Sequence, residues 1–338
     1  MAEHAIEINN LTKKFGDFTA VDDISLNVKN NEIFGFLGPN GAGKSTTIRM
    51  LCTLAQPTSG SALVAGHDLI KESDRVRENI GLVAEKMIMY DRLTAAENLR
   101  FFGKLYAIPK QKLEEKIDEL LELVNMGEWK HTQISKFSTG MKQRINVIRA
   151  LLPEPRILFM DEPTLGLDPQ TTFSIRDIIK EINKSGVTVI LTTHAMTEAE
   201  ALSDRVAIID HGKIAALDTP QKLKNIISNN NATVFGTKIT NLTSGLVEKI
   251  KSLDVVTAVA QQDSHDLKIS ATGTDALNQI IDTIRNEGGN IASITNSNEL
   301  TLEDVFLAVT GKEMRDQANE KAAPVSHRHG VAPKGRVR

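Results

Sequence analysis

Residues 38–46 read GPNGAGKST, a glycine-rich stretch that ends in a lysine and two hydroxyl residues. It matches the pattern G-x-x-x-x-G-K-[ST], in which backbone N–H groups and a helix N-terminus surround phosphate oxygens. In such a loop the lysine reaches the β- and γ-phosphates and the next hydroxyl binds Mg²⁺. The apolar run at residues 33–37 has the composition of a buried strand, which is the expected context. We therefore predict an ATP site formed by Gly38, Pro39, Asn40, Gly41, Ala42, Gly43, Lys44, Ser45 and Thr46.

Two carboxylates follow a second apolar run. Asp161 and Glu162 come directly after residues 157–160, ILFM. Ligands bind at the carboxyl ends of strands in open α/β sheets, and adjacent strand residues point to opposite faces. Asp161 therefore fits Mg²⁺ binding, and Glu162 fits a base or an orienting group for an attacking water. Such a pair can also be only a loop start or a helix cap, but the phosphate loop favours the functional interpretation.

His194 ends a third apolar run, VTVILTTH at residues 187–194. A lone histidine at a strand end is often structural. Its place at the carboxyl end of a strand, beside the other two candidate strands, favours a catalytic role.

A second small-residue turn lies about a hundred residues after the phosphate loop. FSTGM at residues 137–141 precedes a segment with apolar residues at helical spacing, and Ser138 can cap that helix. A helix that begins there would offer a second N-terminus to an anion. Asp168, before Pro169, has the composition of another helix cap, which alone could explain it.

Strands alternate with helices up to residue 217, which predicts an α/β domain with a mostly parallel sheet. We expect this P-loop NTPase domain at residues 1–218, a linker at 219–231 that holds a short helix and an asparagine cluster, and a second domain at 232–312. The second domain has the pattern βαββαβ and is expected to be a small α+β ferredoxin-like sandwich. Residues 313–338 lack an apolar period and are expected to be disordered.

The length, charge and composition of the chain exclude several classes of protein. The chain has 338 residues and a net charge of −3, so it is not a polycation built for nucleic acid. Its single cysteine, Cys52, excludes a disulfide framework, fits a reducing cytoplasm and is expected in the core. No apolar run approaches the ~18 residues of a membrane span, and the N-terminus has no apolar signal core. Work at a membrane would need a partner that supplies the span.

Five motifs occur in order: GPNGAGKST, FSTGMKQR, ILFMDEP, LGLDP and the histidine at 194. Over roughly residues 6–217 they make the chain similar to the ATP-binding cassette (ABC) proteins, the ATPase subunits of ABC transporters. FSTGMKQR, an acidic residue at the Q-loop position and the terminal LTLEDVFLAVTG resemble the prokaryotic exporter ATPases of the daunorubicin-resistance type. The resemblance implies catalytic roles for Lys44, Glu162 and His194, ATP and Mg²⁺ as cofactors, and a helical subdomain at about residues 86–155.

The resemblance also explains the second turn. In that family the stretch equivalent to FSTGM binds the γ-phosphate of ATP held by a second subunit, so two chains arranged head-to-tail share two nucleotides. The implied dimer site consists of Ser138, Thr139, Gly140 and Met141, with Asp168 in the equivalent of the D-loop.

Further residues follow from the same comparison. Phe15, with Ala20, stands where the family stacks an aromatic ring on adenine. Glu85 stands at the Q-loop position and implies a metal ligand beside Ser45 and Asp161. The chain departs from the family pattern at Thr139 and Met141, which replace a glycine and a glutamine, at Glu85, which replaces a glutamine, and in its added C-terminal domain.

The implied partners are a second copy of the chain and a separately encoded permease, with no nucleic acid. The chain would then be cytoplasmic and peripheral on the inner face of the membrane. The alternative is a cassette ATPase without a permease, acting in translation or DNA maintenance; relatives in translation usually have two cassettes, and those in DNA maintenance insert long coiled coils. A nucleotide sensor without turnover is disfavoured by Glu162 and His194.

Overall fold

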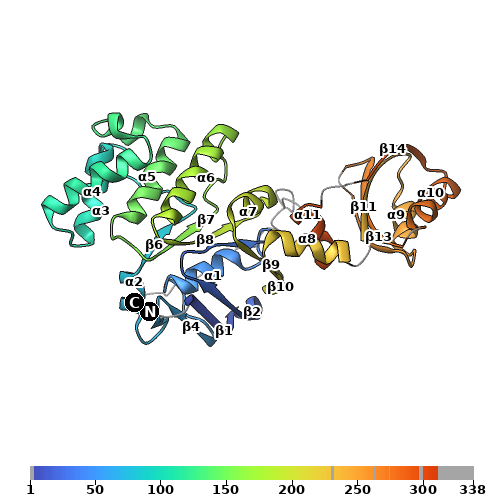
Figure 1. Cartoon of the computed structure of the whole chain (residues 1–338), viewed down its shortest axis with the longest axis horizontal. Coiled ribbons are helices and arrows are strands. Elements are labelled where there is room, and N and C mark those ends of the chain that lie inside the picture. The colour runs from blue at the N-terminus through green and yellow to red at the C-terminus, as the bar shows by residue number, and fades with distance from the viewer. Residues whose placement is uncertain (1–3, 230–231, 262, 274, 297–299, 311–338) are drawn as a thin grey trace, which may run out of the picture.

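The computed structural model describes residues 4–229, 232–261, 263–273, 275–296 and 300–310 (Figure 1). The expected disordered tail at 313–338 lies outside these ranges. Two sheets with their helices occupy the chain as far as residue 218, and a third sheet follows.

The central sheet has six strands in the order β10-β9-β3-β8-β7-β6. All neighbours are parallel except the β9–β10 hairpin, which confirms the predicted mostly parallel sheet. Its strands are β3 (Ile33–Leu37), β6 (Ile80–Val83), β7 (Ile157–Asp161), β8 (Thr188–Thr193), β9 (Arg205–Asp210) and β10 (Lys213–Asp218). Because β3, β8 and β7 are adjacent and parallel, their carboxyl ends lie side by side.

A second, antiparallel sheet has the order β2-β1-β4-β5, and the sequence analysis does not anticipate it. Its strands are β1 (His4–Phe15), β2 (Phe18–Lys29), β4 (Ser59–Val64) and β5 (His67–Asp68). In β2 the buried Ile24, Leu26 and Val28 alternate with polar residues, the pattern of a strand with one face in a core. β1 pairs with β4, which lies beyond the phosphate loop, so this sheet wraps around the loop's helix.

Helices cover both faces of the central sheet. They are α1 (Lys44–Leu51), α2 (Ser73–Glu78), α3 (Ala95–Leu105), α4 (Lys110–Leu123), α5 (Thr139–Leu151), α6 (Pro169–Lys184) and α7 (Met196–Leu202). Phe34 and Phe36 of β3 pack into one core with α1 and the antiparallel sheet. Leu158 and Met160 of β7 pack into another core with α3, α4, α5 and α6. Alternate residues of each strand thus enter different cores, as the strand period requires.

The C-terminal part begins with α8 (Pro220–Asn229) and holds the third sheet. Its elements are β11 (Ala232–Thr240), α9 (Ser244–Lys251), β12 (Val256–Gln261), β13 (Asp266–Thr272), α10 (Ala276–Asn286), β14 (Asn290–Asn296) and α11 (Leu302–Thr310). The strand order is β12-β13-β11-β14, and every neighbouring pair is antiparallel. α9 and α10 bury Leu246, Ile250, Ile280 and Ile284 in the core of this sheet.

The helix α11 packs on the central sheet. Val305 and Phe306 are buried in a cluster with Leu37 of β3, Val206 of β9 and Leu223 of α8. On its other side, the Asp304 carboxylate lies 2.6 Å from Lys268 Nζ on β13, an ion pair that ties α11 to the third sheet. Elements on both sides of the expected boundaries at 218 and 232 therefore share one core, since α8 and α11 pack with β3 and β9. Contacts between segments that are distant in the sequence decide where α8 and α11 lie.

Replacing Phe306 by alanine tests this packing. Removal of a buried phenyl ring costs about 3–5 kcal/mol, so we expect a lower free energy of unfolding in denaturant titrations. The loss should appear in the transition that unfolds the central sheet, because the ring is buried against β3 and β9. Ala308→Ser, at an exposed position of the same helix, is the control and should be neutral. Wild-type stability in Phe306→Ala would contradict the packing of α11 on this core.

Candidate functional site

The phosphate loop connects β3 to α1, and two of its glycines are required by close backbone contacts. A Cβ atom on Gly43, where φ is 110°, would lie 2.5 Å from the carbonyl oxygen of Ala20. A Cβ atom on Gly38 would lie 2.2 Å from the carbonyl oxygen of Ile209. A side chain at either position would displace the loop. The glycines thus allow the loop to fold tightly over the start of α1, at Lys44.

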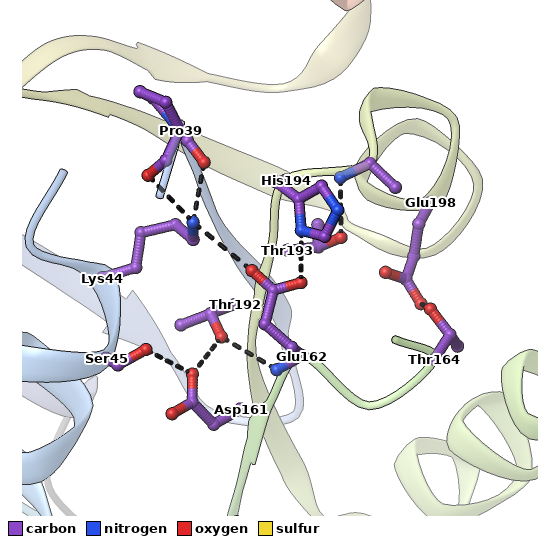
Figure 2. Close-up of polar contacts among 12 residues, drawn as sticks. Pro39, Lys44, Ser45, Asp161, Glu162, Thr164, Thr192, Thr193, His194 and Glu198 are labelled. Carbon is purple, nitrogen blue, oxygen red and sulfur yellow. Dashed lines mark hydrogen bonds and ion pairs between the residues drawn. The ribbon is translucent and has the colours of Figure 1, made fainter. Parts of the chain in front are cut away.

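Lys44 lies at the centre of the site (Figure 2). Its Nζ donates to the carbonyl oxygens of Gly38 at 2.7 Å and Pro39 at 3.2 Å, and lies 3.3 Å from Glu162 Oε1. The side chain is 5% exposed. Burial lowers the pKa of the Lys44 ammonium from its usual value, and the carboxylates of Glu162 and Asp161 oppose this shift. A cation in this place interacts strongly with an anionic ligand because little water screens it.

Asp161 is held by hydroxyl groups from two other elements. Ser45 Oγ, in the first turn of α1, donates to Asp161 Oδ1 at 2.8 Å. Thr192 Oγ1, on β8, donates to the same oxygen at 2.5 Å and accepts the backbone N–H of Glu162 at 3.0 Å. Thr192 thus orients both neighbouring acids. The sequence analysis does not single out Thr192, although the TTH sequence places it two residues before the candidate histidine.

Glu162 makes two contacts through its two carboxylate oxygens (Figure 2). One faces Lys44, and the other, Oε2, lies 2.9 Å from His194 Nδ1. An ionised carboxylate only accepts hydrogen bonds, so this contact places a proton on Nδ1. The Glu162 backbone has a positive φ of 49°, which turns the chain immediately after β7. The three predicted catalytic residues therefore form one connected group.

These groups line a cleft of about 670 Å³, within the usual range of small-ligand sites, roughly 300–1,000 Å³. The cleft also brings in Glu85, which is exposed after β6, and Ala20 beside the loop. Two aromatic rings, Phe15 and Phe18, line one end and are 54% and 62% exposed. They pair across the turn between β1 and β2. Phe18 is absent from the sequence analysis; the repeated aromatic in FGDF was the available signal.

The predicted dimer-site residues lie elsewhere. Ser138 caps α5, as predicted, and its Oγ accepts the N–H of Met141 at 3.2 Å. A Cβ atom on Gly140 would lie 2.4 Å from Thr171 Cγ2 on α6. Thr171 in turn donates to Asp168 through its N–H and hydroxyl, at 2.9 and 2.6 Å.

Those bonds from Thr171 hold the pKa of the Asp168 carboxyl below its usual value. The turn at 138–141 and Asp168 are thus joined through one threonine. None of the predicted dimer-site residues is among the described residues that line the cleft of the same chain.

The oxygen ligands fit Mg²⁺. Ser45 and Glu85 line the cleft, and the Asp161 carboxylate, which does not line it, accepts a hydrogen bond from Ser45 Oγ at 2.8 Å. Within the described ranges, no group of three or more His, Cys, Asp or Glu side chains is placed to hold a metal ion. Mg²⁺ usually takes one or two protein oxygens and completes its shell with water and phosphate, so this sparse set is sufficient.

Two further observations bear on the sequence analysis. Cys52 is buried in the core, as predicted, and burial raises the pKa of its thiol. Across the part of the chain that the structure describes, no helix combines the length and the apolar character that crossing a membrane requires.

Comparison with known proteins identifies the family. A family model described as ABC transporter matches residues 21–165. The chain is 36% identical, over 92% of its length and 100% of the relative's, to the linearmycin resistance ATP-binding protein LnrL of Bacillus subtilis (strain 168). It is 34% identical, over 94% of its length and 96% of the relative's, to the daunorubicin/doxorubicin resistance ATP-binding protein DrrA of Streptomyces peucetius.

Solved structures show the same fold. The structure of an ATP-binding subunit of an ABC transporter matches with a TM-score of 0.60 and 28% identity, over 66% of this chain and 93% of that one. The dimeric structure of an ATP-binding cassette in a post-hydrolysis state, bound to ADP and Pi, matches with a TM-score of 0.57 and 26% identity. That match covers 63% of this chain and 98% of the other. Both matches cover about two thirds of the chain.

Replacing Lys44 by alanine tests the cleft as a nucleotide site. Hydrogen bonds to charged groups contribute about 1.5–3 kcal/mol, so loss of the ammonium should raise the Kd for ATP by about 10- to 100-fold. Equilibrium titration with a fluorescent ATP analogue measures this. Lys184→Ala, at a 70% exposed position on α6, is the matched control. Unchanged affinity in Lys44→Ala would exclude this loop as the phosphate site.

Proposed function

The chain belongs to the ABC transporter family as the ATP-binding subunit of an exporter, with ATP hydrolysis coupled to transport, and from this premise we propose how its own residues bind and cleave ATP. The phosphates occupy the loop at 38–46 and the adenine lies against Phe15 and Phe18. Phosphate oxygens take the place of the carbonyl oxygens that Lys44 now contacts, because an anion is the stronger acceptor for an ammonium. The exposed ring faces supply area for stacking on the base.

Mg²⁺ would be held by Ser45 and Asp161, with Glu85 as a further oxygen ligand on the cleft wall. When bound, the ion neutralises charge on the β- and γ-phosphates. Support for this assignment comes from the donor set: a hydroxyl and carboxylates are the hard oxygens that Mg²⁺ prefers. Thr192 keeps Asp161 in place beside Ser45.

Hydrolysis would depend on Glu162 and His194. A water attacks the γ-phosphorus, Glu162 orients it and accepts its proton, and the bond to the β–γ bridging oxygen breaks to give ADP and inorganic phosphate. His194, whose Nδ1–H would donate to Glu162, would donate its other ring N–H to the γ-phosphate, so that both ring nitrogens carry a proton in this step. The observation that supports this most is the position of one carboxylate between the phosphate-loop lysine and the histidine.

A second copy of the chain would complete each site. ABC ATPase subunits dimerise, and a dimeric cassette is among the similar structures. In this chain Ser138 and Thr139 are exposed at the N-terminus of α5 and do not line the cleft of the same chain. A head-to-tail arrangement would place this turn, with Gly140 and Met141, on the γ-phosphate bound by the partner, and Asp168 at the same interface.

Subunits of this family also pair with a permease. We assign permease docking to the surface after Glu85, where Tyr90 and Phe101 are partly exposed and stack edge-to-face at 4.8 Å, and Ile88 is 67% exposed. Exposed apolar groups gathered in this way are typical of a protein interface. The chain would then lie on the inner face of the membrane, bound through a separate permease.

The substrate class follows from the relatives. Their names link them to resistance to linearmycin, daunorubicin and doxorubicin. The similarity extends over more than nine tenths of this chain in both cases. We therefore infer that the exporter removes antibiotics of this kind.

The C-terminal domain is assigned to the ferredoxin-like class. The strand order β12-β13-β11-β14, with two helices on one face, is the arrangement expected of a βαββαβ unit. This assignment keeps the nucleotide-binding part as a cassette of residues 1–218 with its helical subdomain at about 86–155, to which α8 and α11 are added.

Replacing Glu162 by glutamine tests the catalytic assignment. The amide keeps the shape of the side chain but cannot accept the proton, so kcat should fall by about 100-fold or more, with little change in the Kd for ATP. Steady-state phosphate release and equilibrium ATP binding measure the two quantities. Size-exclusion chromatography with Mg²⁺-ATP should show an accumulated dimer. Turnover at the wild-type rate would refute Glu162 as the base.

Mixed variants test the head-to-tail site. Ser138→Arg and Lys44→Ala should each lack ATPase activity alone, because each homodimer has two damaged sites. Mixed together they form a heterodimer in which the intact loop of one chain meets the intact turn of the other, so part of the activity should return. A mixture of Ser138→Arg with the double variant Ser138→Arg/Lys44→Ala has no intact pair and is the control. Wild-type ATPase activity in Ser138→Arg alone would mean that the turn at 138–141 only caps α5 and does not contact the partner's nucleotide.

A further inference from the structure

Glu198 is a buried carboxylate for which the proposed mechanism has no task so far. It lies in the first turn of α7, four residues after His194, and is 1% exposed. A carboxylate so far from water is costly unless hydrogen bonds compensate it. Its partners therefore indicate why it is there.

Those partners come from two different segments of the site (Figure 2). The hydroxyl of Thr164 donates to Glu198 Oε1 at 2.7 Å. The hydroxyl of Thr193, at the end of β8, favours the ionised form of the same carboxylate and accepts the backbone N–H of Ala195 at 3.0 Å. Because Glu198 lies on α7, its hydrogen bond with Thr164 joins the chain after β7 to the helix that follows β8.

The electrostatic surroundings of Glu198 are balanced. Burial raises the pKa of the Glu198 carboxyl above its usual value, and the nearby charge of Glu162 acts in the same direction. The hydroxyls of Thr193 and Thr164 and the guanidinium of Arg176, on α6, oppose that shift. The two hydroxyl contacts are thus part of what makes a carboxylate tolerable here, so the link and the residue depend on each other.

Each of the two joined segments carries one member of the catalytic pair. Thr164 lies two residues after Glu162 and four before Asp168, and Thr193 directly precedes His194. The two members of the pair are in contact through a hydrogen bond of 2.9 Å between Glu162 and His194. Side chains on two loops keep such a geometry only if the loops are fixed to each other.

We propose that Glu198 is a positioning residue for ATP hydrolysis, which fixes the Glu162 segment to α7, the helix directly after His194, through its hydrogen bond with Thr164. This proposal rests on the proposed function, in which Glu162 and His194 act on the attacking water and the γ-phosphate. Through residues 164–168 the same link fixes Asp168, which caps α6 and faces the partner in the head-to-tail arrangement. Glu198 touches neither nucleotide nor water in this scheme, so its effect passes through the residues that it holds.

A purely structural role for Glu198 predicts a different effect of its replacement on stability and on kcat. A residue that only stabilises the fold lowers the melting temperature and leaves kcat of the folded fraction unchanged. A positioning residue lowers kcat while KM for ATP stays constant, since the phosphate loop and the aromatic rings are not disturbed. The split between kcat and KM therefore separates the two roles.

The experiment compares Glu198→Ala, Thr164→Val and their combination in the full chain, by steady-state Mg²⁺-ATPase rate and by thermal melting. We expect each single change to lower kcat by about 10-fold, as small misplacements of catalytic groups do, with KM within about 2-fold of wild type. The double variant should be no slower than the slower single one, because both changes break one link. Glu198→Gln retains an oxygen that accepts the Thr164 hydroxyl and should recover most of the rate.

Glu200→Ala is the matched control on the same helix, since Glu200 faces away and pairs with Lys224 of α8. Its kcat should equal that of wild type. Wild-type kcat in Thr164→Val, multiplying losses in the double variant, or a Glu198→Gln variant as slow as Glu198→Ala would each overturn the proposal. Should Glu198→Ala fail to fold, Thr164→Val and Glu198→Gln decide the question alone. Glu162→Gln, assayed alongside, distinguishes failure of the proposed mechanism from failure of the positioning role. Full activity in Glu162→Gln would refute the mechanism. An inactive Glu162→Gln together with wild-type kcat in the Glu198 variants would refute only the positioning role.

Discussion

The parallel register of β3, β8 and β7 is the constraint on which the site depends. Leu37, the last residue before the phosphate loop, pairs with Thr193, and Asp161 pairs with Thr192. These pairings place the loop, the acids and the histidine at one edge of the sheet. A slip of one residue would turn Asp161 to the opposite face and break its contacts with Ser45 and Thr192. The buried, apolar faces of these strands exclude such a slip, so core packing fixes the chemistry.

A second coupling lies outside the sheet, between α5 and α6. Gly140 has no side chain, and Thr171 occupies the adjacent space while it bonds Asp168. The turn at 138–141 and the start of α6 are therefore in direct contact. Gln143 of α5 also donates to the carbonyl oxygen of Pro163 at 2.7 Å, which connects α5 to the chain beside Glu162. Two short contacts thus link the proposed dimer surface to the proposed catalytic carboxylate.

Sequence reasoning found the parts of the molecule whose chemistry is local. The phosphate loop, the strands before Asp161 and His194, and the cap at Ser138 are each encoded by a few consecutive residues, so pattern and composition are sufficient to predict them. The antiparallel sheet depends on β1 meeting β4 some fifty residues later, and the packing of α11 depends on contacts with β3 across most of the chain. The roles of Thr192, Glu198 and Phe18 depend on contacts with residues from other segments, so the local sequence does not predict them. The roles of Glu85 and of the turn at 138–141 stay predictions.

The return of α11 to the first half of the molecule bears on how the protein is made. Leu37 belongs to the strand that leads into the phosphate loop, yet it shares its cluster with Phe306. During synthesis the early residues leave the ribosome long before their last packing partner, and domains usually fold as units once their parts are available. The third sheet is an insertion between α8 and α11 in this sense, and it must be translated first. The apolar surface that α11 covers on β3 and β9 therefore stays exposed until the third sheet and α11 have been translated.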